Sequence, residues 1–114
     1  DAQKILEAAL ELEKAGCFGI VLECVPAELA KAITRRAAIP TIGIGAGLGC
    51  DGQVLVTHDM LHLTDRFHPR FARTFARVDE VILKAVSEFK RAVSERRFPS
   101  REETFFMPKR RARE

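Results

Sequence analysis

The stretch GIVLECVP, residues 19–26, contains an apolar run that ends at a carboxylate, Glu23. The run reaches back to Cys17 and carries no charged side chain before Glu23. Continuous apolar runs of this length are typical of strands buried on both faces, as in a parallel sheet. The sequence therefore predicts a strand over residues 17–23 with an acid at its carboxyl end.

Helical patterns lie on both sides of this strand. Residues 2–15 place their apolar side chains largely on one side of a helix, and Gly16 follows where a C-terminal cap is favoured. Pro26 suits the first turn of a second helix, which we expect to end near residues 36–38. The strand is thus predicted to lie between two helices.

A second apolar run, TIGIG at residues 41–45, predicts another buried strand, and a glycine-rich loop follows over residues 46–52. Alternating helices and strands are typical of α/β proteins with a parallel sheet. Two parallel strands cannot cover their own edges and faces. We therefore expect further strands from a longer polypeptide or a partner, and the lack of an initiator Met at Asp1 favours the longer polypeptide.

The C-terminal half contains one clear helical pattern. Apolar residues recur at three- and four-residue steps over residues 69–96, which predicts a long helix that begins at Pro69. The preceding segment, residues 53–63, fits either a strand or a short helix, and we favour the short helix. After Phe98 the prolines and charges predict an irregular tail that is mobile at its end.

Composition excludes several classes of protein. Apolar residues make up 46% of the 114-residue chain, which allows a real core. No apolar run approaches the roughly 20 residues of a membrane-spanning helix, and the charged start lacks the pattern of a signal peptide. The odd count of three cysteines at irregular spacing argues against a disulfide framework or a structural zinc site and for a reducing compartment.

The net charge of +3 is concentrated at the C-terminal end. Residues 90–114 contain nine Lys/Arg and four Asp/Glu, so the rest of the chain is slightly acidic. The tail PKRRARE follows Phe105 and Phe106, a combination that also occurs in nucleic-acid-binding segments. We favour a solvated terminus, and we expect neither nucleic acid nor a membrane as a partner.

Glu23 is the first candidate for chemistry. A carboxylate at the carboxyl end of a strand lies where α/β enzymes place their reacting groups. Burial beside apolar neighbours would raise its pKa towards that of a useful general base. The alternative, that Glu23 only caps the next helix or marks the exit of the strand to water, stays equally open on pattern alone.

The glycine loop allows three interpretations. Gly47, Gly49 and Gly52 match the spacing G-x-G-x-x-G, but the strand and the acidic residue that complete a dinucleotide site are missing. A loop whose backbone approaches a ligand and offers it N–H groups is better supported. A tight turn that needs positive φ angles is an equally good explanation.

Two further motifs have plain explanations. His58 and His62 are four residues apart, but Asp59 stands where a zinc protease has glutamate, so we expect no metal there. Asp51 precedes Gly52 and is expected to cap a following helix.

Three stretches together resemble the ketopantoate hydroxymethyltransferase family: GIVLECVPAELAKAIT, IPTIGIGAGLGCDGQVLVTHDML and RFHPRFARTFA. The resemblance covers nearly all of residues 1–100 and implies a (β/α)₈ TIM barrel of which this chain is the C-terminal part, an incomplete barrel. It assigns the last two βα units and the C-terminal helices to residues 1–98 and leaves residues 99–114 as a basic tail. His62 stands where members of the family commonly have glycine.

The resemblance also implies a reaction. A hydroxymethyl group passes from 5,10-methylenetetrahydrofolate to 3-methyl-2-oxobutanoate and gives 2-dehydropantoate, in pantothenate synthesis. The glutamate of the LECVP block, Glu23 here, is the proton acceptor in the family, and Mg²⁺ polarises the oxo acid. The loop residues Gly45, Ala46 and Gly47 are candidates for substrate binding.

Other implications concern the protein around this chain. The Mg²⁺ ligands of the family match no residue here, so we assign no metal ligand and expect the chain alone to be inactive. The complete enzyme is expected to be a cytoplasmic homo-oligomer. Two alternatives stay open: a related barrel lyase of the phosphoenolpyruvate mutase type, and a basic module that binds partners through its tail.

Overall fold

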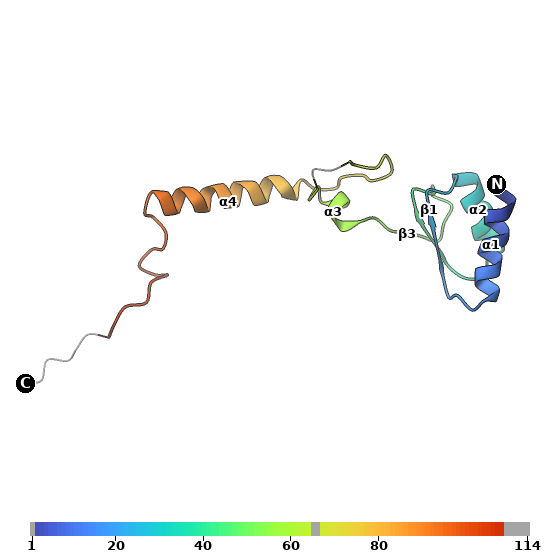
Figure 1. Ribbon diagram of the computed structural model, residues 1–114, viewed down its shortest axis with the longest axis horizontal. Helices are drawn as coiled ribbons and strands as arrows, with labels where there is room; N and C mark the ends of the chain where they lie inside the picture. Colours follow the sequence, from blue (N-terminus) through green and yellow to red (C-terminus); the bar gives the residue numbers. More distant parts are fainter. Residues whose placement is uncertain (1, 65–66, 109–114) are drawn as a thin grey trace, which may run out of the picture. The chain divides into compact units, whose positions relative to one another are not determined.

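The computed structural model describes residues 2–64 and 67–108 (Figure 1). The basic run predicted to be mobile, residues 109–114, lies outside the described residues. The chain divides into two compact units, residues 1–76 and residues 77–114. The elements follow in the order α1 (Ala2–Lys14), β1 (Ile20–Glu23), α2 (Ala27–Arg36), β2 (Thr41–Ile44), β3 (Gly52–Gln53), α3 (Thr57–Met60) and α4 (Val78–Ser94).

The first unit contains a parallel sheet in the order β1-β2-β3. Ile20 pairs with Thr41 and Glu23 with Ile44, so β1 and β2 run in step along their whole length. The α/β class and the parallel arrangement are confirmed. The third strand, β3, spans two residues and lies at the start of the segment for which a strand was the less favoured alternative.

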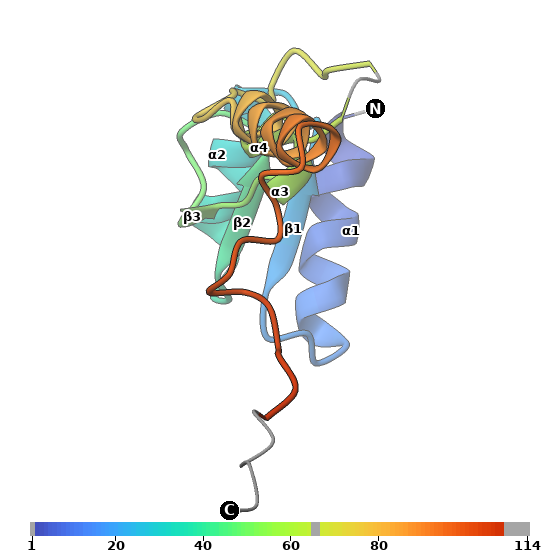
Figure 2. The same cartoon turned by 90° about the vertical axis from the view of Figure 1, so that its left-hand side faces the viewer.

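Helices α1 and α2 cover the same face of the sheet (Figures 1 and 2). Side chains from both helices and from β1 form one apolar cluster, which contains Leu6, Ala9, Ile20, Leu22, Ala30, Ile33 and Ala46. Amphipathic helices stabilise a sheet by burying their apolar stripe in this way. The core therefore lies between the sheet and these two helices.

The opposite face of β1 is open in this chain. Val21 is 62% exposed and Glu23 is exposed, whereas Ile20 and Leu22 are buried. The prediction of a strand buried on both faces is therefore wrong for this chain, because the helices cover only one face. The predicted strand was also too long, since Phe18 is 94% exposed and lies before β1.

The predicted helix over residues 69–96 begins only at Val78. Before it, the backbone N–H groups of Phe75 and Ala76 donate to the carbonyl oxygen of Met60, at 2.8 and 3.4 Å. These donors are thus not available for helical bonds, and tertiary contacts outweigh the local periodicity. The preferred short helix in the ambiguous segment is confirmed as α3, although β3 occupies the start of that segment.

The second unit is built around α4, which has no buried residue. At its end, Arg96 adopts a left-handed φ of 57°, and Arg97 and Phe98 donate their N–H groups to the carbonyl of Ala92. This is the geometry of a helix C-terminal cap. The rings of Phe89 and Phe98 then meet edge to face at 5.4 Å.

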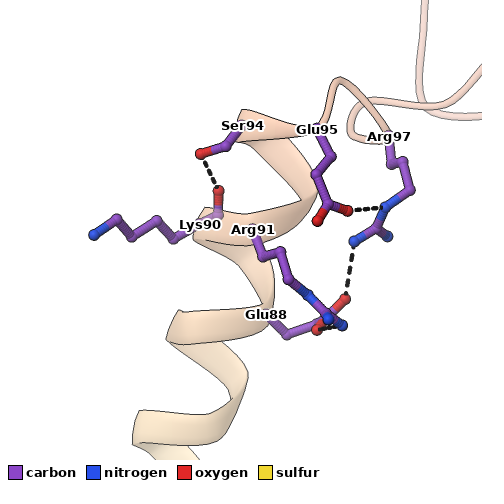
Figure 3. A network of polar contacts seen from close by, with 6 residues as sticks. All are labelled: Glu88, Lys90, Arg91, Ser94, Glu95 and Arg97. Atoms are coloured by element: carbon purple, nitrogen blue, oxygen red, sulfur yellow. Dashed lines mark hydrogen bonds and ion pairs between the residues drawn. The ribbon is translucent and has the colours of Figure 1, made fainter.

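Ion pairs accompany this cap (Figure 3). The guanidinium of Arg97 contacts Glu95 at 2.7 Å and Glu88 at 3.4 Å, and Arg91 also pairs with Glu88. The hydrogen bond from Arg91 is the main reason that the pKa of Glu88 lies below its usual value.

Candidate functional site

Glu23 closes β1 on the open face of the sheet. Its neighbour Leu22 points into the core, and side chains alternate along a strand, so Glu23 lies on the face away from α1 and α2. Glu23 pairs with Ile44, and the N–H of Cys24 donates to the carbonyl of Ile44 at 2.9 Å. The acid thus stands beside the end of β2, at the carboxyl edge of the parallel sheet.

The burial expected around this carboxylate is absent in this structure. Glu23 is exposed, because its face of the sheet is uncovered in this chain. A carboxylate in water is a weak general base at neutral pH, and a protein must surround it to change that. Any catalytic environment for Glu23 thus requires further structure over the open face.

The glycine loop starts directly after Ile44, opposite Glu23. Gly45 and Gly47 have positive φ angles of 64° and 76°, and Ala46 between them is buried. This backbone conformation favours glycine. The interpretation as a tight turn with positive φ is confirmed for these two positions.

The same loop packs closely against its surroundings. A Cβ atom on Gly47 would lie 2.6 Å from that of Ala27, and one on Gly49 would lie 2.8 Å from that of Lys31. Gly52, the last glycine of the G-x-G-x-x-G spacing, begins β3 and not a helix. A dinucleotide fingerprint opens a helix at this point, so the local structure does not support the dinucleotide interpretation.

A cavity of about 630 Å³ lies beside the loop, within the first unit. Its walls are mainly apolar, and Gln53 and Arg73 contribute polar groups. Ile44, Gly45 and Phe71 also line it, so the cavity borders the strand end that pairs with Glu23. Glu23 itself does not line the cavity.

The prediction that Asp51 caps a helix is wrong. Its Oδ2 accepts hydrogen bonds from the backbone N–H of Thr41 at 2.8 Å and from the hydroxyl of Thr41 at 3.1 Å. The side chain therefore reaches back to the start of β2. It stabilises the end of the loop against the sheet.

Sequence reasoning missed three groups near the loop. Gln53 donates from Nε2 to the carbonyl of Gly47 at 2.9 Å, and Phe71 lies against Gly45. The guanidinium of Arg73 lies 5.6 Å from the ring centre of Phe75. The predicted helix had placed both phenylalanines on one continuous stripe, and no pattern linked Gln53 to Gly47.

The arrangement of the histidines and the lengths of the helices bear on metal binding and membrane insertion. Within residues 2–64 and 67–108, no three His, Cys, Asp or Glu side chains group together as metal ligands would. His58 is exposed, and the ring of His62 stacks on His68 with centroids 6.1 Å apart. None of the helices described is both long and apolar enough to cross a membrane.

Comparison with known proteins places these features in a family. The sequence model of ketopantoate hydroxymethyltransferase matches residues 1–101. Curated relatives carry the name 3-methyl-2-oxobutanoate hydroxymethyltransferase. The one from Thermotoga sp. (strain RQ2) is 56% identical over 101 residues, 89% of this chain and 37% of the relative. The one from Legionella pneumophila is 49% identical over 104 residues, 91% of this chain and 40% of the relative.

The chain spans 37–40% of the length of these relatives. The match extends from α1 through α4 and includes Glu23 and the glycine loop. It favours this family over the phosphoenolpyruvate mutase type of lyase. With the family model matching residues 1–101 of 114, the chain belongs to the ketopantoate hydroxymethyltransferase family.

Proposed function

We propose that this chain supplies the proton acceptor and one loop of the active site of a 3-methyl-2-oxobutanoate hydroxymethyltransferase. The observation that carries the proposal is the position of Glu23, at the carboxyl edge of a parallel sheet and opposite the residue that begins the glycine loop. Active sites of α/β proteins form at this edge. The family match supports the reaction named for the relatives.

We further propose that the sheet is part of a (β/α)₈ barrel. Three parallel strands, with α1 and α2 on one face and an open opposite face on β1, are the arrangement expected of part of a barrel wall. In this proposal residues 1–98 are the C-terminal part of the barrel domain, and residues 99–114 are a tail. The cytoplasmic location and the homo-oligomeric assembly rest on the family resemblance alone.

In the proposed reaction, the carboxylate of Glu23 accepts the proton from C3 of 3-methyl-2-oxobutanoate. The electron pair left on C3 forms the new carbon–carbon bond with the one-carbon unit, for which 5,10-methylenetetrahydrofolate is the proposed donor. The carbon–nitrogen bonds of the donor break, tetrahydrofolate leaves, and a water molecule supplies the hydroxyl oxygen of the new hydroxymethyl group. The product is 2-dehydropantoate. Closing the open face would remove water from Glu23 and make it a stronger base.

The described residues do not fit a Mg²⁺ site. Mg²⁺ prefers several oxygen ligands in octahedral geometry, and the residues that the structure describes hold no group of three acidic, histidine or cysteine side chains. No step of the proposed reaction is therefore assigned to a metal held by this chain.

A chimera tests the proposal. Residues 1–101 replace the matching segment of the Thermotoga maritima relative, which is 55% identical over 101 residues, and 2-dehydropantoate formation is measured. We expect an active chimera and an inactive 114-residue chain, because only the chimera covers the face that carries Glu23.

Glu23→Gln in the chimera should lower kcat by roughly 10²- to 10⁴-fold, the usual contribution of a general base. It should also remove the acidic limb of the pH–rate profile, which a purely structural change would leave in place. Glu11→Gln, an exposed position on α1, is the matched control. An active Glu23→Gln chimera with the same pH profile would contradict the role of Glu23.

A further inference from the structure

The glycine loop forms an unusually short connection between two parallel strands. Residues 45–51 join β2 to β3 without a helix, although parallel neighbours are usually joined by a dozen or more residues. The loop therefore lacks the support that a crossover helix normally gives. Two side chains provide support instead: that of Asp51, the last residue of the loop, and that of Gln53 in β3.

Asp51 fastens the end of the loop to the start of β2. Its Oδ2 accepts both hydrogen bonds from Thr41, and its own N–H donates to the hydroxyl of Thr41 at 3.3 Å. Thr41 is fully buried, and its hydroxyl also lies 2.8 Å from that of Thr34 on α2. One oxygen of Asp51 thus bonds both the backbone and the side chain of a buried residue, which fixes the end of the loop to the sheet.

Gln53 fastens the middle of the loop. It lies in β3, where pairing with Gly43 fixes its position relative to β2. From there its side-chain amide donates to the carbonyl of Gly47 at 2.9 Å. The orientation of the Gly47 peptide is therefore set by a side chain from the neighbouring strand.

The helix α2 forms the wall behind the loop. Gly47 approaches Ala27 and Gly49 approaches Lys31 so closely that neither glycine has room for a Cβ atom. The loop is thus pressed against α2 on one side and bonded at its middle and its end. Few backbone conformations of residues 45–47 satisfy all of these contacts.

We infer that Asp51 and Gln53 are positioning residues that fix the backbone of Gly45, Ala46 and Gly47 next to Glu23. The functional part of this inference rests on the proposed function, since it takes the loop as a substrate-binding element. In this inference neither Asp51 nor Gln53 contacts the reacting atoms of the substrate. These two side chains determine the position of the loop, and the loop in turn positions the substrate relative to the carboxylate of Glu23.

The first test uses the 114-residue chain and does not depend on enzymatic activity. Backbone ¹⁵N order parameters of residues 45–50 are measured by NMR. We expect a rigid loop, near 0.85, in the parent chain and values below about 0.6 in Asp51→Ala. Asp51→Asn should behave as the parent, because the two bonds from Thr41 use one oxygen, which an amide also provides.

If Asp51→Ala unfolds the chain, as judged by circular dichroism, Gln53→Met decides the question. Methionine keeps the length of the side chain but cannot donate to Gly47. Lower order parameters at residues 46–48 in this variant support the inference. Unchanged values in Gln53→Met, or a loop as mobile in Asp51→Asn as in Asp51→Ala, overturn it.

The second test uses the active chimera. Gln53→Met should raise KM for 3-methyl-2-oxobutanoate and lower kcat/KM by roughly tenfold, while the pH profile assigned to Glu23 stays in place. A mobile loop with unchanged kinetics would overturn the functional part only. A chimera without activity would count against the proposed function, and the NMR test would still decide whether Asp51 and Gln53 hold the loop.

Discussion

The two units of the chain obtain their structure from different interactions. All buried apolar residues among those described lie within residues 1–76, whereas α4 buries none. The first unit combines an apolar core with a buried polar anchor at Thr41. Among its described residues, the second unit has one helix, α4, with an exposed apolar stripe, a C-terminal cap and surface ion pairs.

This difference teaches what an amphipathic pattern can and cannot predict. The stripes of α1 and α4 follow the same spacing rule, and both segments are helical. Among the described residues, the stripe of α1 is buried in the apolar cluster, whereas no residue of α4 is buried. Periodicity predicts which side of a helix is apolar, but the partner of that side depends on the rest of the fold.

The largest effect that would sharpen this comparison concerns Ile33. This side chain is fully buried between α2 and the sheet, so Ile33→Ala should lower the free energy of unfolding of the first unit by about 2–5 kcal/mol. Urea unfolding followed by NMR measures it. Val86→Ala, on α4 and 59% exposed, should change stability by no more than about 0.5 kcal/mol. An equal loss in both variants would break the comparison, because it would show that the stripe of α4 is covered in solution.

A smaller effect is expected at Gly47. Gly47→Ala combines a positive φ with a methyl group 2.6 Å from the Cβ of Ala27, so we expect a loss of about 1–3 kcal/mol in unfolding free energy. Gly16→Ala is the control, since Gly16 also has a positive φ but has open space around it. If the two variants lose equal stability, the close approach to α2 contributes nothing.

The smallest effect concerns pH and the second unit. Arg91 and Arg97 face Glu88, and the hydrogen bond from Arg91 holds the pKa of Glu88 below the ordinary value of 4.5. A carboxyl group whose pKa is lowered on folding stabilises the folded state at any pH above its ordinary pKa. This stabilisation disappears as the pH falls through the lowered pKa of the folded state. The last turn of α4 should therefore lose helix content below about pH 4.5, measured by Cα chemical shifts.

Glu88→Gln should remove that part of the pH dependence, whereas Glu102→Gln, at an exposed position beyond the helix, should leave it unchanged. A last turn that responds to acid equally in the parent and in Glu88→Gln would show that the ion pairs of Figure 3 do not stabilise the helix end.

Local patterns predicted α1, α2, β1 and β2 because each of these elements carries its own periodicity or apolar run. They could not place the start of α4, since Met60 accepts hydrogen bonds from Phe75 and Ala76, and such long-range bonds leave no local trace. They also could not show that Asp51 bonds Thr41. Aspartate before a turn suits a cap equally well, and only the parallel register of β2 and β3 brings the two residues together.

The candidate site was predictable in position but not in environment. An acid at the end of an apolar run marked Glu23, and the glycine spacing marked the loop. The exposure of Glu23 follows from which face the helices cover, which no single stretch of sequence encodes. The role of Glu23 as proton acceptor and of the loop in substrate binding stay predictions.

The close approach of Gly47 to α2 also restricts the helix. Ala27 is exposed, and surface positions on helices usually tolerate almost any residue. Here a larger residue at position 27 would push into the loop, just as a side chain at position 47 would push into the helix. Homologous sequences should consequently retain small residues at both positions, although position 27 looks like an ordinary surface site.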